Sequence, residues 1–385
     1  MRKRKICIVI TTRGNYAKMS SVMGSIVACP ELELQLIIGG GLLLPKYGFN
    51  VEERIGRRFH IDRSIHFLVE GETPVTMAKS AGLALSDFTT AFDDLEPDFV
   101  VVIADRFECL PIAMAASYMN VPVAHVEGGE VSGSIDESVR HAVTKMSHVH
   151  FPATAGAAKR IERLGEDPAT IFTVGCTSLD VVRTLDLTDL SGVMEMQRGV
   201  GVGDQVDLTK PYLLVIQHPV TTEYDQNLAH VNETIAAVEA SGMGVVWIWP
   251  NMDAGSDGIS KGIRILRETK NPKNFHFFKS LPIEHYATLL NNAACIVGNS
   301  SSGIREAVFL GVPSVTVGTR QAGRERGKNV VEVPYDRDAI LVALRRAVAH
   351  GRYEPDYLYG DGTAGGRIAE ILRTVQVQPQ KRITY

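Results

Sequence analysis

The sequence predicts an α/β protein of two doubly wound, Rossmann-like domains with an interdomain cleft. Three observations predict this fold. The chain has 385 residues, more than a single hydrophobic core usually organises, so two domains are expected. Short β-branched runs alternate with helical stretches through both halves, which is typical of parallel α/β layers. These runs are apolar almost throughout, as strands are when helices cover both faces of their sheet.

Six strands are expected in the first half, at 5–11, 34–38, 65–68, 99–103, 121–126 and 171–174. The long helix expected at 74–95 carries one apolar stripe, since Met77, Ala81, Leu85 and Phe88 recur every three or four residues. A polar, glycine-containing stretch at 185–211 then marks the domain boundary. We expect the first domain at 1–200.

The second half repeats the alternation, with strands expected at 212–216, 244–249, 275–278, 295–297, 314–317 and 330–333. Helices such as 283–293 lie between them, and the second domain is expected at 201–363. A last helix is expected at about 364–378. The sequence leaves open whether this helix packs back on the first domain.

The composition excludes several classes of protein. Hydrophobic residues make up 45% and charged residues 22% of the chain, and the net charge is −4, so disorder and a basic nucleic-acid surface are not expected. No apolar run reaches 18 residues, and the run at 6–10 is too short for a signal peptide. The five cysteines are scattered without zinc spacing, which indicates buried thiols in a cytoplasmic protein. The triple glycine at 39–41 does not fit a dinucleotide fingerprint.

Candidate functional residues follow the expected strands, because ligands of doubly wound domains bind at the carboxyl ends of the strands. Arg13, beside Gly14, follows the first strand, where a cation suits a phosphate. Asp105 and Arg106 follow the fourth strand, as a candidate proton-transfer group and a candidate charge clamp. A solvated arginine and a turn-closing ion pair are the structural alternatives.

The densest ionisable cluster follows the fifth strand, where Glu127, Glu130 and Asp136 surround a glycine-rich turn. Carboxylates crowded in a partly dry cleft have their pKa values pushed apart, so that one can serve as base and another as acid. Ser134 and Glu137 have the spacing of a capping box that opens a helix. Compensation of the helix dipole is the structural alternative for Asp136.

In the second domain, His218 follows the first strand, as a candidate general acid or diphosphate ligand. A core histidine is its structural alternative. Polar residues of the kind that grip a hydroxylated ligand follow the next strand, at Asn251, Asp253 and Ser256.

The segment GNSSSGIRE, from Gly298, follows another apolar strand and opens a helix. Backbone N–H groups with Ser300 and Ser301 would form an anion cradle for a diphosphate, and Glu306 would accept hydrogen bonds from ribose hydroxyls. Arg320, after the next strand, adds a cation to the same rim.

These segments together resemble the family of hydrolysing UDP-N-acetylglucosamine 2-epimerases, including the epimerase half of the bifunctional epimerase/kinase of animal sialic acid synthesis and the bacterial enzymes of sialic and legionaminic acid pathways. The resemblance rests on six segments in the family's order, HVEGGEVSGSIDESVRHAVTKMSH from His125, QHPVTT from Gln217, PNMDAGS from Pro250, GNSSSGIRE from Gly298, GTRQAGRERG from Gly318 and YGDG from Tyr359. One departure is Ala104, which stands where the family usually has glycine.

The resemblance implies a fold of the GT-B type in which the second domain holds the nucleotide. It implies deprotonation at C2 of the sugar, elimination of the nucleotide diphosphate to a glycal, and hydration to a free sugar with inverted C2. It also implies acid/base roles for Asp105, Glu127 and Asp136, an essential His218, and nucleotide contacts from a set of polar residues, Arg13, Arg106, Ser300, Ser301, Glu306 and Arg320.

By the same resemblance we expect no cofactor, and a homodimer or homotetramer. The base and the sugar stay open between UDP-GlcNAc and a UDP- or GDP-linked 2,4-diacetamido sugar. A non-hydrolysing 2-epimerase, a binding protein without turnover and a glycosyltransferase are the other functions considered. The sequence does not identify which carboxylate is the base, nor whether an end product regulates the protein.

Overall fold

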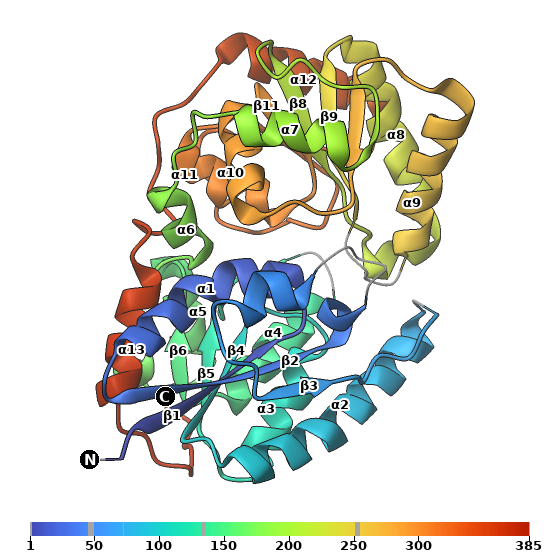
Figure 1. Cartoon of the computed structure of the whole chain (residues 1–385). Coiled ribbons are helices and arrows are strands. Elements are labelled where there is room, and N and C mark those ends of the chain that lie inside the picture. The colour runs from blue at the N-terminus through green and yellow to red at the C-terminus, as the bar shows by residue number, and fades with distance from the viewer. Residues whose placement is uncertain (1, 45–49, 72, 133–134, 251–254, 385) are drawn as a thin grey trace. The chain divides into compact units, whose positions relative to one another are not determined.

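The computed structural model describes residues 2–44, 50–71, 73–132, 135–250 and 255–384. The chain divides into two compact units (Figure 1). The first contains Met1–Glu130, Ile135–Arg183 and Tyr359–Tyr385, and the second contains Val131–Ser134 and Thr184–Leu358. Within the described part of the chain, no helix is both long and apolar enough to cross a membrane.

The first unit is built on a six-stranded sheet, and all of its strands are parallel. In sheet order the strands are β3 (Arg63–Ile65), β2 (Leu32–Gly39), β1 (Arg4–Ile10), β4 (Phe99–Ile103), β5 (Val123–Val126) and β6 (Val149–Phe151). The α-helices of this unit are α1 (Arg13–Ala28), α2 (Pro74–Leu95), α3 (Cys109–Tyr118), α4 (Asp136–Met146), α5 (Ala155–Arg163), α6 (Ser178–Thr184) and α13 (Ala364–Thr374).

The strands are apolar throughout because each face of the sheet has its own core. Ile6, Ile8 and Ile10 of β1 pack in a cluster with α1 and α13. The alternate residues Cys7 and Val9 pack in a second cluster with α2 and α3. Successive side chains of a strand point to opposite faces, so both layers of helices bury apolar surface.

The second unit is built on a seven-stranded sheet in which only the edge strand β7, among the described strands, runs antiparallel to its neighbour. In sheet order the strands are β13 (Val330–Val333), β12 (Ser314–Val317), β11 (Cys295–Gly298), β8 (Tyr212–Ile216), β9 (Gly244–Ile248), β10 (Phe275–Phe278) and β7 (Val202–Gly203). The α-helices are α7 (Ser191–Gly199), α8 (Asn227–Ser241), α9 (Ser256–Ile265), α10 (Ile283–Asn292), α11 (Glu306–Leu310) and α12 (Arg337–His350). The predicted pair of doubly wound, Rossmann-like domains is confirmed.

The C-terminal helix belongs to the first unit. α13 lies beside α1 (Figure 1), and Ile368 and Leu372 join the core on that face of the sheet. The carboxylate of Asp180 accepts hydrogen bonds from the backbone N–H groups of Ala364 and Gly365, at 2.9 and 2.6 Å, and thereby caps the start of α13.

The YGDG motif has a structural explanation at this junction. The carbonyl oxygen of Tyr359 accepts a hydrogen bond of 2.7 Å from the backbone N–H of Cys176. A Cβ atom on Gly360, whose φ is +105°, would lie 2.7 Å from the Cα atom of Gly175. Only glycine permits that approach together with that φ. The motif therefore joins the returning chain to the start of α6.

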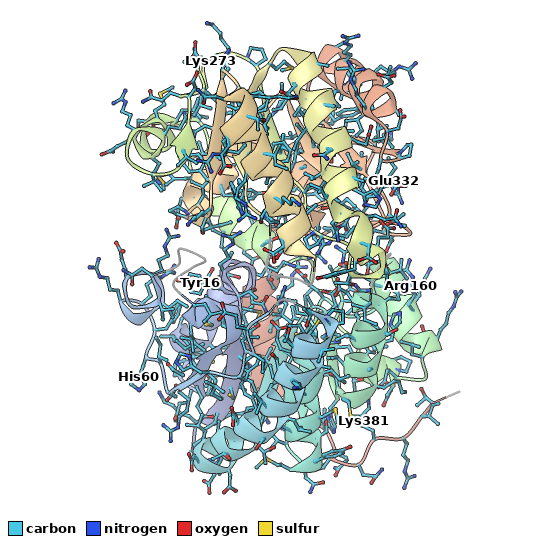
Figure 2. The ribbon with its side chains drawn as sticks, turned by 90° about the vertical axis from the view of Figure 1, so that its right-hand side faces the viewer. Tyr16, His60, Arg160, Lys273, Glu332 and Lys381 are labelled. Atoms are coloured by element: carbon cyan, nitrogen blue, oxygen red, sulfur yellow. The ribbon has the colours of Figure 1, made fainter. Side chains whose placement is uncertain are left out.

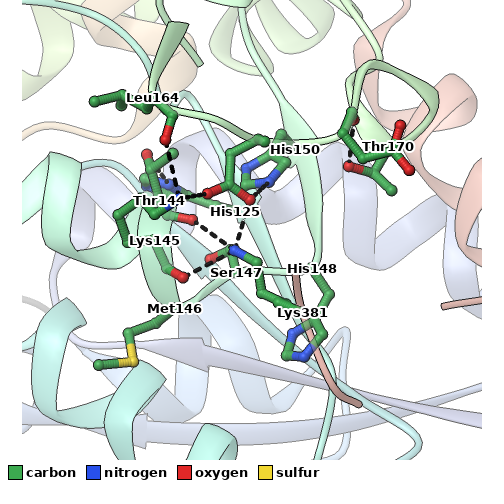
Figure 3. Close-up of polar contacts among 12 residues, drawn as sticks. His125, Thr144, Lys145, Met146, Ser147, His148, His150, Leu164, Thr170 and Lys381 are labelled. Carbon is green, nitrogen blue, oxygen red and sulfur yellow. Dashed lines mark hydrogen bonds and ion pairs between the residues drawn. The ribbon is translucent and has the colours of Figure 1, made fainter. Parts of the chain in front are cut away.

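The residues after α13 are held by an ionic cluster. Lys381 donates from Nζ to Glu166 Oε2 at 2.6 Å and to the carbonyl oxygen of Lys145 at 2.8 Å (Figure 3). Glu166 also lies 2.5 Å from Lys145 Nζ and 3.2 Å from His150 Nε2. Burial raises the pKa of Glu166, but the three hydrogen bonds outweigh burial and lower it to about 2.

Two sequence expectations differ from the structure. The run at 171–174 is not a strand, since only Ile171 forms an isolated bridge, to His150 of the unpredicted strand β6. The chain passes into the second unit after Arg183 rather than near residue 200, because α7 packs Val193 into a core of the second sheet. The capping box stays a prediction, because Ser134 lies outside the described residues; its other member, Glu137, pairs with Arg140 and His141.

Candidate functional site

The strand order identifies where each unit would bind a ligand. The sheet order reverses direction between β1 and β4 in the first unit and between β8 and β11 in the second. In open α/β sheets, ligands bind beyond the carboxyl ends of the strands at this switch point. The residues directly after these four strands are Thr11, Ala104, Gln217 and Asn299. Among the predicted site residues, those within two positions of them are Arg13, Asp105, Arg106, His218, Ser300 and Ser301.

Asp105, after β4, is held by a buried arginine. Arg140 of α4 is fully buried, and its Nε atom lies 3.0 Å from Asp105 Oδ2, which also accepts a hydrogen bond from Nη2. Nη1 of the same guanidinium donates to the carbonyl oxygen of Glu130 at 2.9 Å and to Glu137 Oε2 at 2.8 Å. Arg140 thus brings two predicted site residues, Asp105 and Glu130, to one point. Its position inside α4 carries no sequence signal of this role.

The residue before Asp105 has an unusual backbone conformation. Ala104 has a φ of +62°, in the left-handed region that favours glycine. Its carbonyl oxygen accepts a hydrogen bond of 2.8 Å from Nε2 of the buried His125. Nε2 must therefore carry the proton, and Nδ1 faces the hydroxyl of Thr144 at 3.2 Å (Figure 3). Burial lowers the pKa of His125 to about 4, so the ring is neutral at pH 7.

Glu127, after β5, is also left-handed, with a φ of +61°, and it is buried. Lys18 Nζ lies 2.6 Å from Glu127 Oε2, and the thiol of Cys176 donates to Oε1 at 2.9 Å. An ammonium group at this distance stabilises a carboxylate, which offsets the cost of burying its charge. Sequence reasoning missed Lys18 and Cys176. The available signal for Lys18 was a charged side chain between the buried residues Tyr16 and Met19 of α1.

The other predicted residues of the first unit lie at the start of helices or in the turns before them. Arg13 is the first residue of α1, and burial followed by the charge of Arg54 lowers its pKa to about 10. Tyr16, labelled in Figure 2, donates a hydrogen bond of 2.7 Å to the carbonyl oxygen of Arg54. Arg106 pairs with Glu108 at 2.8 Å. Asp136 is half-buried and begins α4, one turn before Arg140.

In the second unit, Asn299 joins the ends of β8 and β11. Its side chain accepts a hydrogen bond of 2.6 Å from the backbone N–H of His218 and donates one of 2.8 Å to the carbonyl oxygen of the same residue. Gly298 precedes it with a φ of +123°, and a Cβ there would lie 2.1 Å from the carbonyl oxygen of Ile216. These contacts fix the backbone of His218 beside the serine-rich turn.

The serine-rich turn itself is partly open to solvent. Ser300 and Ser301 are half-buried, and Ser301–Gly303 form a 3₁₀ turn, η7, in which the backbone N–H of Ser302 donates to the Ser300 hydroxyl at 3.3 Å. Ser302 instead points inward and accepts a hydrogen bond from Tyr286. Glu306 is buried at the start of the short helix α11. Backbone N–H groups and small hydroxyls at such a turn are typical anion ligands.

Arg320 reaches the same turn from the loop after β12. Its Nη1 atom donates to the carbonyl oxygen of Asn299 at 3.2 Å, and Gln321 Nε2 donates to that oxygen at 2.8 Å. Within the second unit, His218, Ser300 and Arg320 are therefore connected through Asn299, which the sequence analysis had not named.

The residues predicted after β9 are described only in part. Ser256 is buried at the start of α9. Asn251 and Asp253 lie outside the described residues. Among the described residues, no group of three or more His, Cys, Asp and Glu side chains is arranged to hold a metal ion.

Comparison with known proteins identifies the family to which these features correspond. Residues 25–373 match the profile of a family described as UDP-N-acetylglucosamine 2-epimerase. A UDP-N,N'-diacetylbacillosamine 2-epimerase (hydrolyzing) of Legionella pneumophila is 34% identical over 98% of this chain and 97% of its own length. A UDP-N-acetylglucosamine 2-epimerase of Neisseria meningitidis is 33% identical over 99% of this chain and 98% of its own length.

The fold has the same relatives. The crystal structure of UDP-GlcNAc 2-epimerase from Neisseria meningitidis bound to UDP-GlcNAc superimposes with a TM-score of 0.78, at 16% identity, over 96% of this chain and 99% of that one. At that level of identity the likeness concerns the fold, which is of the GT-B type.

Proposed function

The chain belongs to the UDP-N-acetylglucosamine 2-epimerase family, and from that membership we propose that it is a hydrolysing nucleotide-sugar 2-epimerase. The substrate is UDP-GlcNAc or a close relative, and the products are UDP and a free sugar of the ManNAc type. The observation that carries this proposal is the pair of cation-held carboxylates, Asp105 and Glu127, within two residues of the ends of neighbouring strands of the first unit. Binding a nucleotide-sugar without turnover would not need them.

Two of the relatives carry the hydrolysing type in their names. Those of Legionella pneumophila and Campylobacter jejuni, 34% and 32% identical to this chain, are both named hydrolyzing. The names are mixed, because those of Neisseria meningitidis, at 33% identity, and Salmonella typhimurium, at 26%, read UDP-N-acetylglucosamine 2-epimerase without that word. A relative at 30% identity is named for polysialic acid biosynthesis, which supports a role in making acidic sugars. A cytoplasmic location and a homo-oligomeric assembly are further parts of the proposal.

The chemistry has two steps. A base of the protein takes the proton from C2 of the sugar, the electrons of that C–H bond form a C1=C2 double bond, and UDP leaves with the electrons of the C1–O bond. Water then adds to the glycal. The water oxygen bonds to C1, and a base takes up one of the water protons. A proton is delivered to C2 on the face opposite to the one from which the base removed the original C2 proton. One water molecule is consumed, and C2 is inverted.

We assign the proton transfers to the first unit and the nucleotide to the second. Asp105, Glu127 and Asp136 carry the acid/base steps, with Glu130 beside them, because a base near C2 and an acid are both needed. His218, the serine-rich turn and Arg320 stabilise the departing diphosphate through charge and N–H donors. Glu306 and Ser256 hold the nucleoside. Arg13 and Arg106 complete the phosphate contacts.

The decisive experiment follows the sugar by NMR in D₂O. Purified protein is incubated with UDP-GlcNAc, with a UDP-linked 2,4-diacetamido sugar and with its GDP-linked counterpart. We expect UDP or GDP release together with a free manno-configured sugar that carries deuterium at C2. A nucleotide-sugar that keeps its nucleotide and only inverts C2 would instead identify a non-hydrolysing epimerase. No change in any of the nucleotide-sugars would refute the enzyme assignment.

The identity of the sugar is the second question that this panel answers. The relative of Legionella pneumophila is named for a diacetylbacillosamine substrate, whereas that of Neisseria meningitidis is named for UDP-GlcNAc, at nearly equal identity. The 2,4-diacetamido sugar is therefore the alternative substrate, and the ratio of kcat/KM values between the two compounds decides between them.

The carboxylates should separate turnover from nucleotide binding. We predict that Asp105→Asn, Glu127→Gln and Asp136→Asn each lower kcat by about 10²- to 10⁴-fold, as expected for loss of a proton-transfer group. UDP binding, measured by calorimetry, should change by less than about threefold, since we assign the nucleotide to other residues.

Asp98→Asn is the matched control. Asp98 directly precedes β4, at the end of the strand opposite to Asp105, and its carboxylate accepts a hydrogen bond from the backbone of Lys5 at 2.8 Å. The same chemical change there should leave kcat within about twofold of wild type. If the three site variants behave like Asp98→Asn, the acid/base assignment is wrong.

A further inference from the structure

Arg140 has a role that neither the sequence motifs nor the family comparison assigned. It is a fully buried arginine. Its guanidinium donates hydrogen bonds to Asp105 after β4, to the carbonyl oxygen of Glu130 after β5, and to Glu137 of its own helix. We propose that Arg140 is a positioning residue that fixes Asp105 at the end of β4 and keeps it ionised, so that Asp105 enters the reaction as a proton acceptor. This inference rests on the proposed function.

The geometry supports the claim that Arg140 fixes the position of Asp105. Two N–H groups of the guanidinium, Nε and Nη2, converge on Asp105 Oδ2, with Nε at 3.0 Å. The third donor group is used by Glu130 and Glu137, so the guanidinium plane is fixed by partners on both sides. A planar donor held in this way restricts where the carboxylate can lie, which a flexible ammonium group would not do.

Helix α4 holds the residue before Asp105 as well. Thr144 lies one turn after Arg140 on the same face of the helix, and its hydroxyl faces Nδ1 of His125. His125 in turn donates to the carbonyl oxygen of Ala104, at 2.8 Å. Two consecutive residues, Ala104 and Asp105, are thus anchored from two consecutive turns of α4. This arrangement holds the left-handed turn that presents the Asp105 side chain.

The charges around Asp105 support the claim that Arg140 keeps Asp105 ionised. Cys109 of α3 and His125 of β5 interact electrostatically with Asp105, and Glu130 and Glu137 interact with Arg140. Arg106 and Glu108, in the turn after β4, act on Cys109. Arg140 is the cation bonded directly to Asp105, whereas Arg106 pairs with Glu108.

The arginine itself stays charged in spite of its burial. Burial lowers the pKa of Arg140, but the charge and hydrogen bonds of Asp105, with Glu130 and Glu137, more than offset burial and raise it. Weakening the pair would leave a carboxylate with less compensation in a dry site, and such a carboxylate binds a proton more readily.

Arg140→Lys tests the inference because it keeps the positive charge and removes the fixed fork of donors. We expect kcat at pH 7 to fall by about tenfold or more, and the acidic limb of the kcat/KM profile to move upward by about one pH unit, since Asp105 then holds its proton to higher pH. The dissociation constant for UDP should stay within about threefold of wild type. A role confined to folding would not move the pH profile.

Arg4→Lys is the matched control. Arg4 begins β1, at the amino end of the sheet, and donates to the carbonyl oxygens of Leu372 and Val375 at 2.6 and 2.9 Å. The same substitution there removes the same fork of donors from a partly buried arginine. We expect an unchanged pH profile for this variant.

A second measurement does not depend on turnover. In protein labelled with ¹³C at the aspartate carboxyl groups, the Asp105 signal is assigned by its loss in Asp105→Asn, and its titration is followed by NMR. We expect an ionised Asp105 at pH 7 in the wild type and titration at higher pH in Arg140→Lys. An Asp105 that is protonated at pH 7 in the wild type, or that titrates identically in both proteins, overturns the inference.

These readouts separate the two ideas. If wild-type protein converts no nucleotide-sugar, the proposed function fails, yet the NMR titration still tests whether Arg140 controls Asp105. Should Arg140→Lys not yield folded protein, Glu137→Gln takes its place. Removing that neighbouring negative charge leaves Asp105 a larger share of the arginine's charge, so the Asp105 titration should move to lower pH. An unchanged titration or a shift to higher pH would contradict the role given to Arg140.

Discussion

Two residues with side chains adopt left-handed backbone conformations directly after neighbouring strands, Ala104 after β4 and Glu127 after β5. Such a conformation costs on the order of 1 kcal/mol for a residue other than glycine or asparagine and persists where surrounding contacts determine it. Here the contacts are a buried histidine for Ala104, and a lysine and a thiol for Glu127. Strain of this kind is typical of functional turns, and both residues adjoin or form the candidate site.

Ala104→Gly should therefore not destabilise the protein. Glycine adopts a φ of +62° without strain, which offsets its greater flexibility in the unfolded chain, so we expect the free energy of unfolding to stay level or rise by up to about 1 kcal/mol. Urea unfolding measures it. Ala78→Gly, in the exposed interior of α2, is the control and should cost about 1 kcal/mol. Equal losses in both variants would show that the turn at Ala104 carries no strain.

His125 should make stability depend on pH. Its pKa is about 4 in the folded protein, against 6.5 in the unfolded chain, because burial disfavours the charged ring. The unfolded state thus binds a proton at higher pH than the folded state. The contribution of His125 to the free energy of unfolding is therefore fully present above pH 6.5 and is lost as the pH falls toward 4. The loss is on the order of 3 kcal/mol. Urea unfolding from pH 7 to 4 should show a shallower slope for His125→Gln. Parallel slopes would mean that the histidine titrates alike in both states.

The residues of the site were predictable to different degrees. Asp105, Glu127 and His218 could be found because they lie within two residues of the ends of apolar strands, and strand ends carry function in this fold. Lys18 and Arg140 could not, because they lie inside helices and their partners are distant in sequence, at separations of 109 and 35 residues. The role of Asn299 could not be predicted either, because its side chain joins two strand ends through the backbone of a residue distant in sequence, His218.

Among the elements, the returning helix α13 depends on a carboxylate from another part of the chain. Asp180 caps the helix through the backbone N–H groups of Ala364 and Gly365. A Cβ on Gly365 would lie 2.8 Å from the backbone of Ser21, so α13 and α1 are in close contact at this point. The sequence predicted the helix from its apolar pattern, but the cap and the close approach are tertiary contacts that a pattern does not contain.

Asp180→Ala should loosen α13 before the rest of the first unit. Loss of a cap typically costs about 1 kcal/mol. Hydrogen exchange should quicken in residues 364–374 while β1 and β4 stay protected. Asp167→Ala, which removes a comparable cap from the short 3₁₀ turn Pro168–Thr170, is the control and should leave α13 unchanged. Uniform acceleration in the Asp180 variant would mean that α13 does not open separately.

The strand that was missed has a physical explanation. β6 reads Val149-His150-Phe151 and follows His148, so its sequence lacks the apolar continuity of the other strands. His150 is nevertheless buried, and its Nε2 atom lies 3.2 Å from Glu166, which compensates its polarity. The apolar run at 171–174 looked like a better strand, but only one of its residues bridges to β6.

At the scale of the whole molecule, the two units repeat one architecture. The order β3-β2-β1-β4-β5-β6 of the first sheet recurs as β10-β9-β8-β11-β12-β13 in the second, with β7 added at the edge. The two units differ in the groups that lie beyond the carboxyl ends of their strands. In the first unit these groups are carboxylates held by cations, and in the second they are hydroxyls, N–H groups and an arginine.

UDP should therefore protect the second unit more than the first. At a concentration about 100 times its dissociation constant, UDP should add about 2.7 kcal/mol to the free energy of unfolding of the unit that binds it. Hydrogen exchange of the full chain should slow most in residues 298–306 and 314–321, with smaller effects in β1 to β6. Protection confined to the first unit would reverse the assignment of the nucleotide.

The return of Tyr359–Tyr385 to the first unit also bears on how the protein is made. On the ribosome, residues 184–358 emerge before the segment that completes the N-terminal half, so the unit begun first is finished last. Until α13 arrives, the core that α1 shares with the sheet lacks Ile368 and Leu372. Nascent chains would therefore expose an apolar surface through most of translation, and any transcript cut short near its end would yield a product that chaperones and proteases recognise.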